Sequence, residues 1–434
     1  MGKQKLIAMM LTAAKIYKAL FSILLVFTLI DLYTYTGLRA SLRSSSSRMR
    51  KIVFRAFWAI NFAVYILVLY TAWLQSPKYG FAGGWFKFMA AVLFISYIPK
   101  IFYIIFLLIE DIYRLIRFIA VAPYKLIKKE EASSVELFQS RRKFIANTGT
   151  IVAAIPFTGM VYGITKGKYN FKVHKVEITY KDLPKGFDGI QMTQLSDIHS
   201  GSFDNKEAVQ HAVDLANEQK SDIMFFTGDL VNNRSDEMAN WMDVFGKLKA
   251  PMGVYSSLGN HDYGDYAEWP SAEAKQANLE KLFDIHKQLG FKLLRNENMK
   301  IERNGSHIEL LGLENWGKGG FSKYGDLNKT LQGTEPDSFK ILMSHDPTHW
   351  EAQVMNNAEH HIHLTLAGHT HGAQFGVEIG DVKISPARLS YDRWAGLYEE
   401  NGKYLYVNRG LGFIGFPGRV GIWPEITVIT LRSA

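Results

Sequence analysis

The first third of this chain contains apolar runs long enough to restrict it to membrane-spanning helices. Residues 19–36, 56–74 and 86–109 each approach the roughly 20 apolar residues that cross a bilayer as an α-helix. Outside a membrane, helices that are apolar on every face would need a large protein core around them. A fourth, weaker run covers residues 144–164. We therefore predict an all-α transmembrane region at the front of the chain.

Charge also separates the two halves of the chain. Residues 1–143 carry 21 Lys and Arg against 6 Asp and Glu, whereas residues 144–434 carry 29 against 35. A basic region beside membrane helices suits anionic lipid head groups, while a nucleic-acid-binding domain would carry its own basic face. We expect membrane lipids as partners and no nucleic acid, and no protein partner is evident. The absence of cysteine excludes a disulfide and a cysteine nucleophile.

These patterns predict three regions: residues 1–143 with three helices and a basic linker, residues 144–170 with a fourth span or anchor, and residues 171–434 as a separate domain. The first loop and the linker after the third run together hold 14 Lys and Arg, against 6 in the N-terminal segment and the second loop. The positive-inside rule places the first loop and that linker in the cytoplasm. Four spans then make the last domain of this multi-pass membrane protein extracytoplasmic, and three make it cytoplasmic.

Four further residues of the membrane part need an interpretation. Arg141-Arg142 resembles a twin-arginine export signal, although a basic flank of the last helix is the simpler interpretation. Asp31 and Lys100 lie in or near the apolar runs, where ionisable groups cost free energy and often serve a function. We expect Asp31 to reach the interface and Lys100 to extend its ammonium group toward water.

Five short polar motifs follow one another along the second half of the chain. They are Asp197-Ile198-His199, Gly228-Asp229, Gly259-Asn260-His261-Asp262, His345 and Gly368-His369-Thr370-His371. Apolar runs typical of buried strands, at residues 190–195, 223–226 and 253–258, precede the first three. The intervals of 32 and 31 residues between them match one strand-helix-strand unit of roughly 30. The motifs therefore meet at one edge of a sheet in an α/β fold.

The residue types in these motifs indicate a metal site. Two neighbouring divalent ions need a shared carboxylate and several nitrogen or oxygen donors, and Mn, Fe and Zn accept such a mixture. The predicted ligands are Asp197, His199, Asp229, Asn260, His345, His369 and His371. Residues 360, 361 and 363 are histidines on an apparent strand outside the motifs, and we expect structural or surface roles for them.

The motif series resembles that of the calcineurin-like metallophosphoesterases. The resemblance covers about residues 171–434, including the segments 406–412 and 424–426, and is strongest to membrane-linked bacterial members such as UDP-2,3-diacylglucosamine pyrophosphatases and envelope phosphodiesterases. It implies a four-layer α/β/β/α sandwich. It also implies that Asp197, His199 and His371 hold a first metal and Asn260, His345 and His369 a second, with Asp229 bridging the two.

The same resemblance implies a reaction and a cellular setting. Two metal ions would convert a bridging water to hydroxide and polarise the phosphoryl oxygens during hydrolysis of a phosphodiester or pyrophosphate. His261 would protonate the leaving oxygen, with Asp262 orienting it. We expect an envelope or lipid-linked phosphate ester as the substrate, at a bacterial inner membrane.

Other features of the catalytic half leave alternatives open. Arg419 could contact a substrate phosphate, and the segments 315–333 and 389–397, with Tyr391 and Arg393, could border the metals. A phosphomonoesterase or protein phosphatase would use the same metals on a different leaving group. A non-enzymatic membrane sensor with an inherited site is the third possibility. An amphipathic helix over residues 267–290 is predicted to pack on the sheet.

Overall fold

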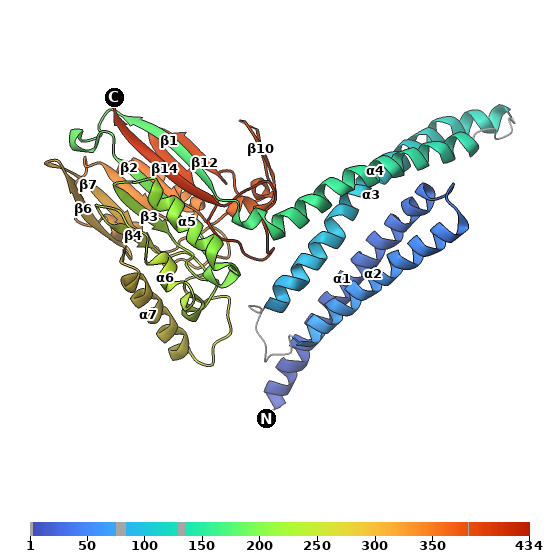
Figure 1. Cartoon of the computed structure of the whole chain (residues 1–434), viewed down its shortest axis with the longest axis horizontal. Helices are drawn as coiled ribbons and strands as arrows, with labels where there is room; N and C mark the ends of the chain where they lie inside the picture. Colours follow the sequence, from blue (N-terminus) through green and yellow to red (C-terminus); the bar gives the residue numbers. More distant parts are fainter. Residues whose placement is uncertain (1–2, 75–83, 129–134, 381) are drawn as a thin grey trace. The chain divides into compact units, whose positions relative to one another are not determined.

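The computed structural model describes residues 3–74, 84–128, 135–380 and 382–434. The chain divides into two compact units, Met1–Val161 and Tyr162–Ala434, which we call the membrane unit and the catalytic unit (Figure 1). The division falls inside one helix and nine residues before the start that we predicted for the last domain. The end of that helix therefore belongs to the catalytic unit.

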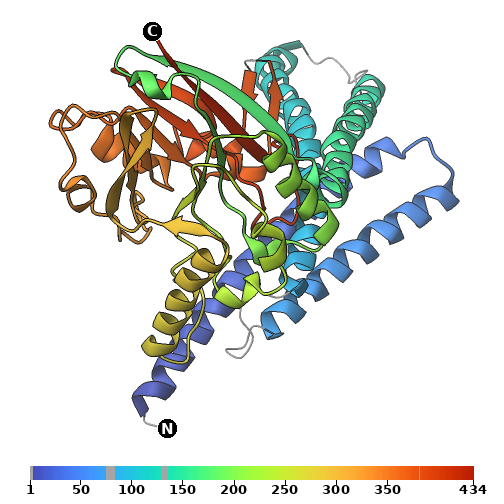
Figure 2. The same ribbon diagram turned by 60° about the vertical axis from the view of Figure 1, so that its left-hand side comes forward.

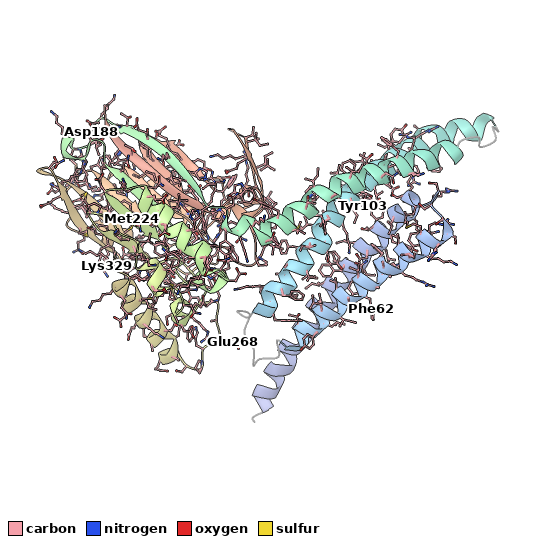
Figure 3. The ribbon with its side chains drawn as sticks, viewed as in Figure 1. Phe62, Tyr103, Asp188, Met224, Glu268 and Lys329 are labelled. Atoms are coloured by element: carbon pink, nitrogen blue, oxygen red, sulfur yellow. The ribbon has the colours of Figure 1, made fainter. Side chains whose placement is uncertain are left out.

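Long helices make up the described part of the membrane unit. They are α1 (Lys3–Ser41), α2 (Ser47–Leu74), α3 (Gly84–Lys128) and most of α4 (Val135–Thr165). Each contains a segment long and apolar enough to cross a membrane: Leu20–Ser41, Ser47–Ala72, Trp85–Ala120 and Arg141–Thr165. Figure 3 shows Phe62 pointing outward from α2, whereas Tyr103 of α3 is buried between helices. The weaker fourth run therefore also forms a helix suited to spanning a bilayer.

The ionisable pair of the membrane unit is not arranged as the sequence suggested. Asp31 is fully buried, and the Lys100 ammonium lies 2.6 Å from its Oδ1 atom. The Tyr65 hydroxyl donates to Asp31 Oδ2 over 2.6 Å, and Lys100 Nζ also donates to the Asn61 side-chain oxygen over 2.6 Å. Because each ion supplies the other's opposite charge inside the bundle, neither needs to reach water. The expectation that Lys100 extends its ammonium group toward water was wrong, because that group is bonded inside the bundle.

Two six-stranded sheets form the centre of the catalytic unit. The first has the order β1 (Lys172–Tyr180), β14 (Glu425–Ser433), β2 (Gln191–Leu195), β3 (Ile223–Thr227), β4 (Val254–Ser257) and β5 (Phe291–Leu293). The second has the order β12 (Gly396–Glu400), β13 (Lys403–Val407), β9 (Leu364–Ala367), β8 (Lys340–Met343), β7 (Ser306–Gly312) and β6 (Glu297–Arg303). A separate antiparallel hairpin consists of β10 (Val377–Ile379) and β11 (Val382–Ile384).

Apolar side chains define the layers. One core lies between the sheets, where Ile178 and Ile429 of the first meet Ile308 and Ile341 of the second. A second core lies between the first sheet and the helices α5 (Lys206–Glu218), α6 (Met242–Phe245) and α7 (Ala272–Gln288), which gather on one side of it in Figures 1 and 2. A third lies on the outer face of the second sheet, beside the short helices α8 (Leu327–Leu331) and α9 (Pro347–His349). The predicted four-layer α/β/β/α sandwich is confirmed, with a thin outer layer on the second sheet.

Local sequence explains where these helices start and which face they bury. On α5, Val209, Ala212, Val213 and Ala216 are buried, a spacing that places them on one helix face. The predicted helix over 267–290 corresponds to α7, which starts later because the Ser271 side chain accepts a hydrogen bond from the Ala274 amide. Such an N-cap satisfies an amide that the first helical turn leaves free.

Candidate metal centre

The predicted ligands lie on loops that follow strands of both sheets. Asp197 and His199 follow β2, Asp229 follows β3 and Asn260 follows β4. The remaining three follow strands of the second sheet: His345 after β8, and His369 and His371 after β9. Because β2, β3 and β4 run parallel, and β8 and β9 do as well, each set of loops emerges at one edge of its sheet.

Asp197, His199 and His371 form the first cluster of potential ligands. One ligand atom from each lies within 4.8 Å of the other two, and all three residues are buried. The Nε2 atoms of His199 and His371 face each other at 3.0 Å. His371 Nε2 is also 3.2 Å from Asp197 Oδ1. Two imidazole nitrogens and a carboxylate converging in this way offer three donors to one cation.

Asp229, His345 and His369 form the second cluster, with ligand atoms also within 4.8 Å of one another. The side-chain oxygen of Asn260 joins it, because it lies 2.8 Å from His369 Nδ1. Asp229 Oδ2 lies 3.1 Å from His345 Nε2 and 3.5 Å from His199 Nε2 of the first cluster. The Asp229 carboxylate therefore lies between the clusters, where a shared ligand would have to be.

Backbone strain is concentrated at these ligands. Five of the seven have a positive φ angle, which is uncommon for residues other than glycine: Asp197, His199, Asp229, His369 and His371. Residues in such conformations cost on the order of 1–3 kcal/mol each and persist where the surrounding structure enforces them. Two glycines allow the close packing, since a Cβ atom would collide with the Asp229 carboxylate at Gly259 and with the Asp197 carboxylate at Gly368.

The electrostatics of the site favour a cation. Burial would lower the pKa of His345, but the Asp229 and Asp197 carboxylates outweigh it and raise that pKa to about 10. Conversely, burial would raise the pKa of Asp229, and His345 and its other histidine neighbours instead hold it well below its usual range. The two buried carboxylates thus favour positive charge at this position. Divalent cations would supply the same compensation.

His261 lies beside the two clusters. Its ring is 5.0 Å from the ring of His199, and its Nδ1 atom is 2.7 Å from the Asn232 carbonyl oxygen. Because a carbonyl only accepts, Nδ1 carries the proton in this bond. Nε2 is therefore the nitrogen that can exchange a proton with a substrate, as a general acid requires.

Asp262 does not orient His261 in this structure; the Asn232 carbonyl does. The Asp262 carboxylate instead accepts hydrogen bonds from four backbone amides, those of Gly259, Asp229, Leu230 and Val231. These amides belong to the loops after β3 and β4. Asp262 therefore fixes those two ligand loops against each other, and the predicted pairing with His261 is absent among the described residues.

Arg419 also has a different place from the predicted substrate contact. Its side chain is fully buried. The guanidinium donates to the carbonyl oxygens of Gly412 and Arg409, and its Nη2 atom lies 3.1 Å from His371 Nδ1. A group enclosed in this way supports the His371 ring from behind and leaves no open side for a substrate phosphate.

Several residues at the rim of the site were predicted only as parts of bordering segments. The Phe321 ring lies 4.8 Å from the His369 ring, and the Tyr391 hydroxyl is 2.9 Å from His369 Nε2. Arg393 lies elsewhere, paired with Glu351 at 2.9 Å.

Two residues near the ligands were not predicted from the sequence. The Tyr266 hydroxyl accepts a hydrogen bond from the Asn260 side-chain amide, and Asp346 Oδ2 is 3.4 Å from His369 Nε2. Asp346 directly follows a ligand, which was the only available signal.

Three of the remaining histidines have structural partners. His363 precedes β9 and does not lie within it, and its Nε2 atom is 2.8 Å from Asp182 Oδ2. His286 forms a hydrogen bond with Ser256, and His349 forms one with Ser344.

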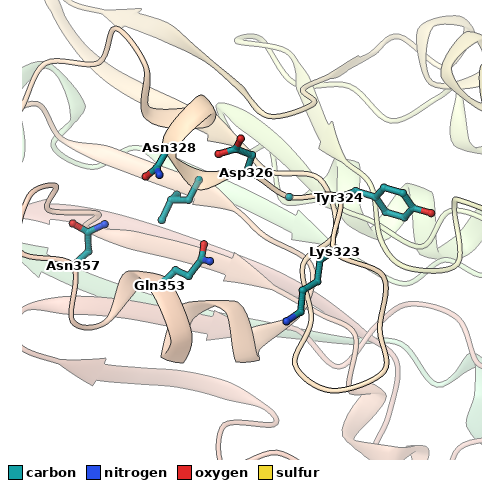
Figure 4. A pocket seen from close by; sticks show the side chains of 8 residues that line it. Lys323, Tyr324, Asp326, Asn328, Gln353 and Asn357 are labelled. Carbon is teal, nitrogen blue, oxygen red and sulfur yellow. The ribbon is translucent and has the colours of Figure 1, made fainter.

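A hollow of about 520 Å³ lies beside Lys323, Asp326, Asn328 and Gln353 (Figure 4). No predicted ligand lines that hollow, so it is separate from the metal centre.

Known protein families match both units. The family model described as "Probable Calcineurin-like phosphoesterase, transmembrane domain" matches residues 17–168, and the model "Calcineurin-like phosphoesterase" matches residues 190–373. The uncharacterized metallophosphoesterase YkuE of Bacillus subtilis is 30% identical over 68% of this chain and 98% of its own length. The zebrafish (Danio rerio) "Transmembrane protein with metallophosphoesterase domain" is 30% identical over 63% of this chain and 60% of its own length.

Among solved structures, a phosphopantetheinyl hydrolase from Mycobacterium tuberculosis matches 50% of this chain and 88% of its own, with 12% identity and a TM-score of 0.31. The chain belongs to the calcineurin-like metallophosphoesterases, a family of metal-dependent phosphoester hydrolases, and carries the transmembrane domain of its membrane-anchored members.

Proposed function

We propose that this protein is a two-metal phosphodiesterase or pyrophosphatase that acts on a lipid-linked substrate at the membrane surface. The observation that carries the proposal is the Asp229 carboxylate, which lies within 3.5 Å of ligand nitrogens from both clusters. A single metal would not need a carboxylate in that position. Two ions sharing one carboxylate are the arrangement used for in-line displacement at phosphorus.

The residues present fit two divalent ions. The facing Nε2 atoms of His199 and His371 form a poor contact without a proton or a cation between them. Within the described residues, His199 Nδ1 is also buried without a hydrogen-bond partner. A mixture of imidazole, carboxylate and amide donors suits Mn, Fe or Zn. When bound, such ions polarise phosphoryl oxygens and lower the pKa of coordinated water.

The chain's own groups have separate tasks in this reaction. His261, held through Nδ1 by the Asn232 carbonyl, presents Nε2 to donate a proton to the leaving oxygen. Tyr266 holds the Asn260 amide so that its side-chain oxygen faces His369. The Phe321 and Tyr391 side chains contact His369 at the rim, where they would exclude water from the reacting phosphate.

The membrane unit supports a lipid-linked substrate. An enzyme whose substrate is confined to the bilayer gains by being held there, because both partners then diffuse in the same plane. The basic residues around the first loop, and those in the last part of α3 and the first part of α4, favour a cytoplasmic position for both regions. With four spans, that topology makes the catalytic unit extracytoplasmic, which agrees with an envelope substrate.

The test is hydrolysis by the detergent-purified full chain. Bis-p-nitrophenyl phosphate, p-nitrophenyl phosphate and UDP-2,3-diacylglucosamine would each be assayed with Mn and with chelator. Metal-dependent cleavage of the diester or of the nucleotide lipid supports the proposal. Faster turnover of the monoester would favour a phosphomonoesterase instead, and a metal-loaded protein inactive on every ester would contradict an enzymatic role.

A further inference from the structure

The hairpin β10–β11 has an uncovered apolar face. Its register pairs Val377 with Ile384 and Ile379 with Val382, so the four side chains share one face of the two-stranded sheet. All four are exposed, from 49% for Val377 to 72% for Ile379. Four adjacent β-branched side chains in water are unfavourable, and such patches usually mark an interaction surface.

The opposite face of the hairpin fixes its orientation. Glu378 points to that face and accepts hydrogen bonds from the Arg409 guanidinium at 2.6 and 3.1 Å. Arg409 is itself held by Glu425 of β14, so the hairpin is anchored to the central sheet. The apolar face is therefore held outward by the ion pair between Glu378 and the buried Arg409.

The root of the hairpin is bonded to the segment that receives the end of α4. The Gly376 amide donates to the Val420 carbonyl over 2.9 Å, and the Val420 amide donates to the Gln374 carbonyl over 2.8 Å. On the other side of the same segment, the Arg419 amide donates to the Gly163 carbonyl over 3.2 Å. A Cβ atom on Gly163 would lie 2.8 Å from the Val420 side chain, so the contact is close.

That end of α4 is also the end of a candidate membrane span, which runs from Arg141 to Thr165. The Tyr162 ring packs against Trp423 with their centroids 5.8 Å apart. Tyr and Trp are enriched where membrane meets water, and the exposed Lys166 follows at once. The hairpin root is therefore bonded to the same segment as the last residues of this candidate span.

A short segment joins the hairpin to the metal centre. Ser385, directly after β11, donates from its hydroxyl to the Gly372 carbonyl over 2.7 Å. Leu389 follows with 91% exposure, and Tyr391 then reaches His369. A surface that contacts lipid through the hairpin would thus place the rim of the site next to the lipid head groups.

From this geometry we propose that the apolar face of β10–β11 inserts into the boundary between head groups and acyl chains of the membrane in which α4 ends. Apolar side chains on an otherwise polar surface bind membranes at this depth. The inference deepens the proposed function and rests on it for the lipid-linked substrate. Insertion itself is measured without any turnover.

The absence of cysteine allows single-cysteine probes in the full chain. Ile379→Cys would be labelled with an environment-sensitive fluorophore and the protein reconstituted in phosphatidylcholine–phosphatidylglycerol vesicles that contain nitroxide-labelled lipids. The matched control is Lys383→Cys on the polar face of the same hairpin. Glu302→Cys on β6, at the opposite edge of the catalytic unit in Figure 1, is the remote control.

We expect quenching at position 379 at least about twofold stronger than at 383, and background quenching at 302. Equal quenching at 379 and 302 would overturn the proposal. A 379 probe that is buried even without lipid, and that cross-links to a second copy or to the chain's own helices, would also overturn the proposal. The apolar face would then be covered by protein and not by lipid. If the 379 probe is strongly quenched but the protein hydrolyses no lipid ester, membrane insertion would be supported and the proposed function would be contradicted. Metal-dependent thermal stabilisation of each labelled variant verifies its fold.

Discussion

The membrane unit and the catalytic unit both bury charged side chains, but they balance the charge differently. In the membrane unit, the Asp31 carboxylate lies 2.6 Å from the Lys100 ammonium, so the protein supplies both charges. In the catalytic unit, Asp197 and Asp229 lie among histidines, and the two carboxylates raise the pKa of His345 to about 10. In the membrane unit the protein itself supplies the positive charge that compensates the carboxylate. In the catalytic unit, bound cations would have to supply it. A buried charge thus indicates a ligand site only where the protein leaves it uncompensated.

The largest effect is expected from the shared carboxylate. Asp229→Asn keeps the shape of the side chain but removes its charge, and we expect turnover to fall on the order of 10⁴-fold with loss of bound metal. Turnover and metal content would be measured on the same sample. Asp214→Asn, an exposed carboxylate on α5, is the control. Two bound ions and normal turnover in the Asp229 variant would show that this carboxylate is not shared.

In the membrane unit the comparable change acts on stability. Lys100→Met leaves Asp31 buried without a cation, and breaking such a pair costs about 3–5 kcal/mol. Thermal unfolding in detergent would measure the loss. The double variant Asp31→Asn, Lys100→Met should recover most of it, since neither charge remains. A single variant as stable as the parent chain would mean that Asp31 finds another partner.

A smaller loss is expected at the proton donor. His261→Ala should lower turnover about a hundredfold while both ions stay bound, because the residue is not among the predicted ligands. The loss should be greater for an alkyl diester than for a p-nitrophenyl diester, whose leaving group needs little protonation. Equal losses on the two substrates would argue against general-acid catalysis. His211→Ala, which removes an exposed histidine on α5, serves as the matched control.

The smallest effect concerns a residue that only positions a ligand. Tyr391→Phe removes the hydroxyl 2.9 Å from His369 Nε2. Losing such an outer contact typically weakens metal binding about 10–100-fold. Turnover at saturating metal should therefore fall less than tenfold, while more metal is needed to reach it. An unchanged metal titration would show that the hydroxyl does not hold the His369 ring.

Much of the catalytic fold could be predicted because its signals are local. A short apolar run that ends in Asp or Asn indicates a buried strand and the loop after it, and β2, β3 and β4 lie where such runs occur. The predicted helix over 267–290 starts too early because the Ser271 cap sets the first residue of α7 at Ala272. Ligand identities follow from the same motifs, since each ligand lies two to four residues beyond its strand.

The errors concern residues whose role depends on distant partners. Arg419 looked free to bind a phosphate, yet it is enclosed by carbonyls and supports His371, 48 residues away. Asp262 lies next to His261 in sequence, but its carboxylate faces amides 31 to 33 residues away. Nothing in the local pattern distinguishes an arginine or aspartate that binds a ligand from one that binds backbone.

The sequence by itself determined the transmembrane helices, the α/β class and the set of candidate ligands, because hydrophobic period, run length and motif order are properties of neighbouring residues. Only the tertiary structure decided that His199 and His371, 172 residues apart, face each other at 3.0 Å. It also decided that Asp31 pairs with Lys100 and that the apolar face of the β10–β11 hairpin is uncovered. Contacts of this kind are set by how whole sheets and helices pack, and no local pattern encodes them.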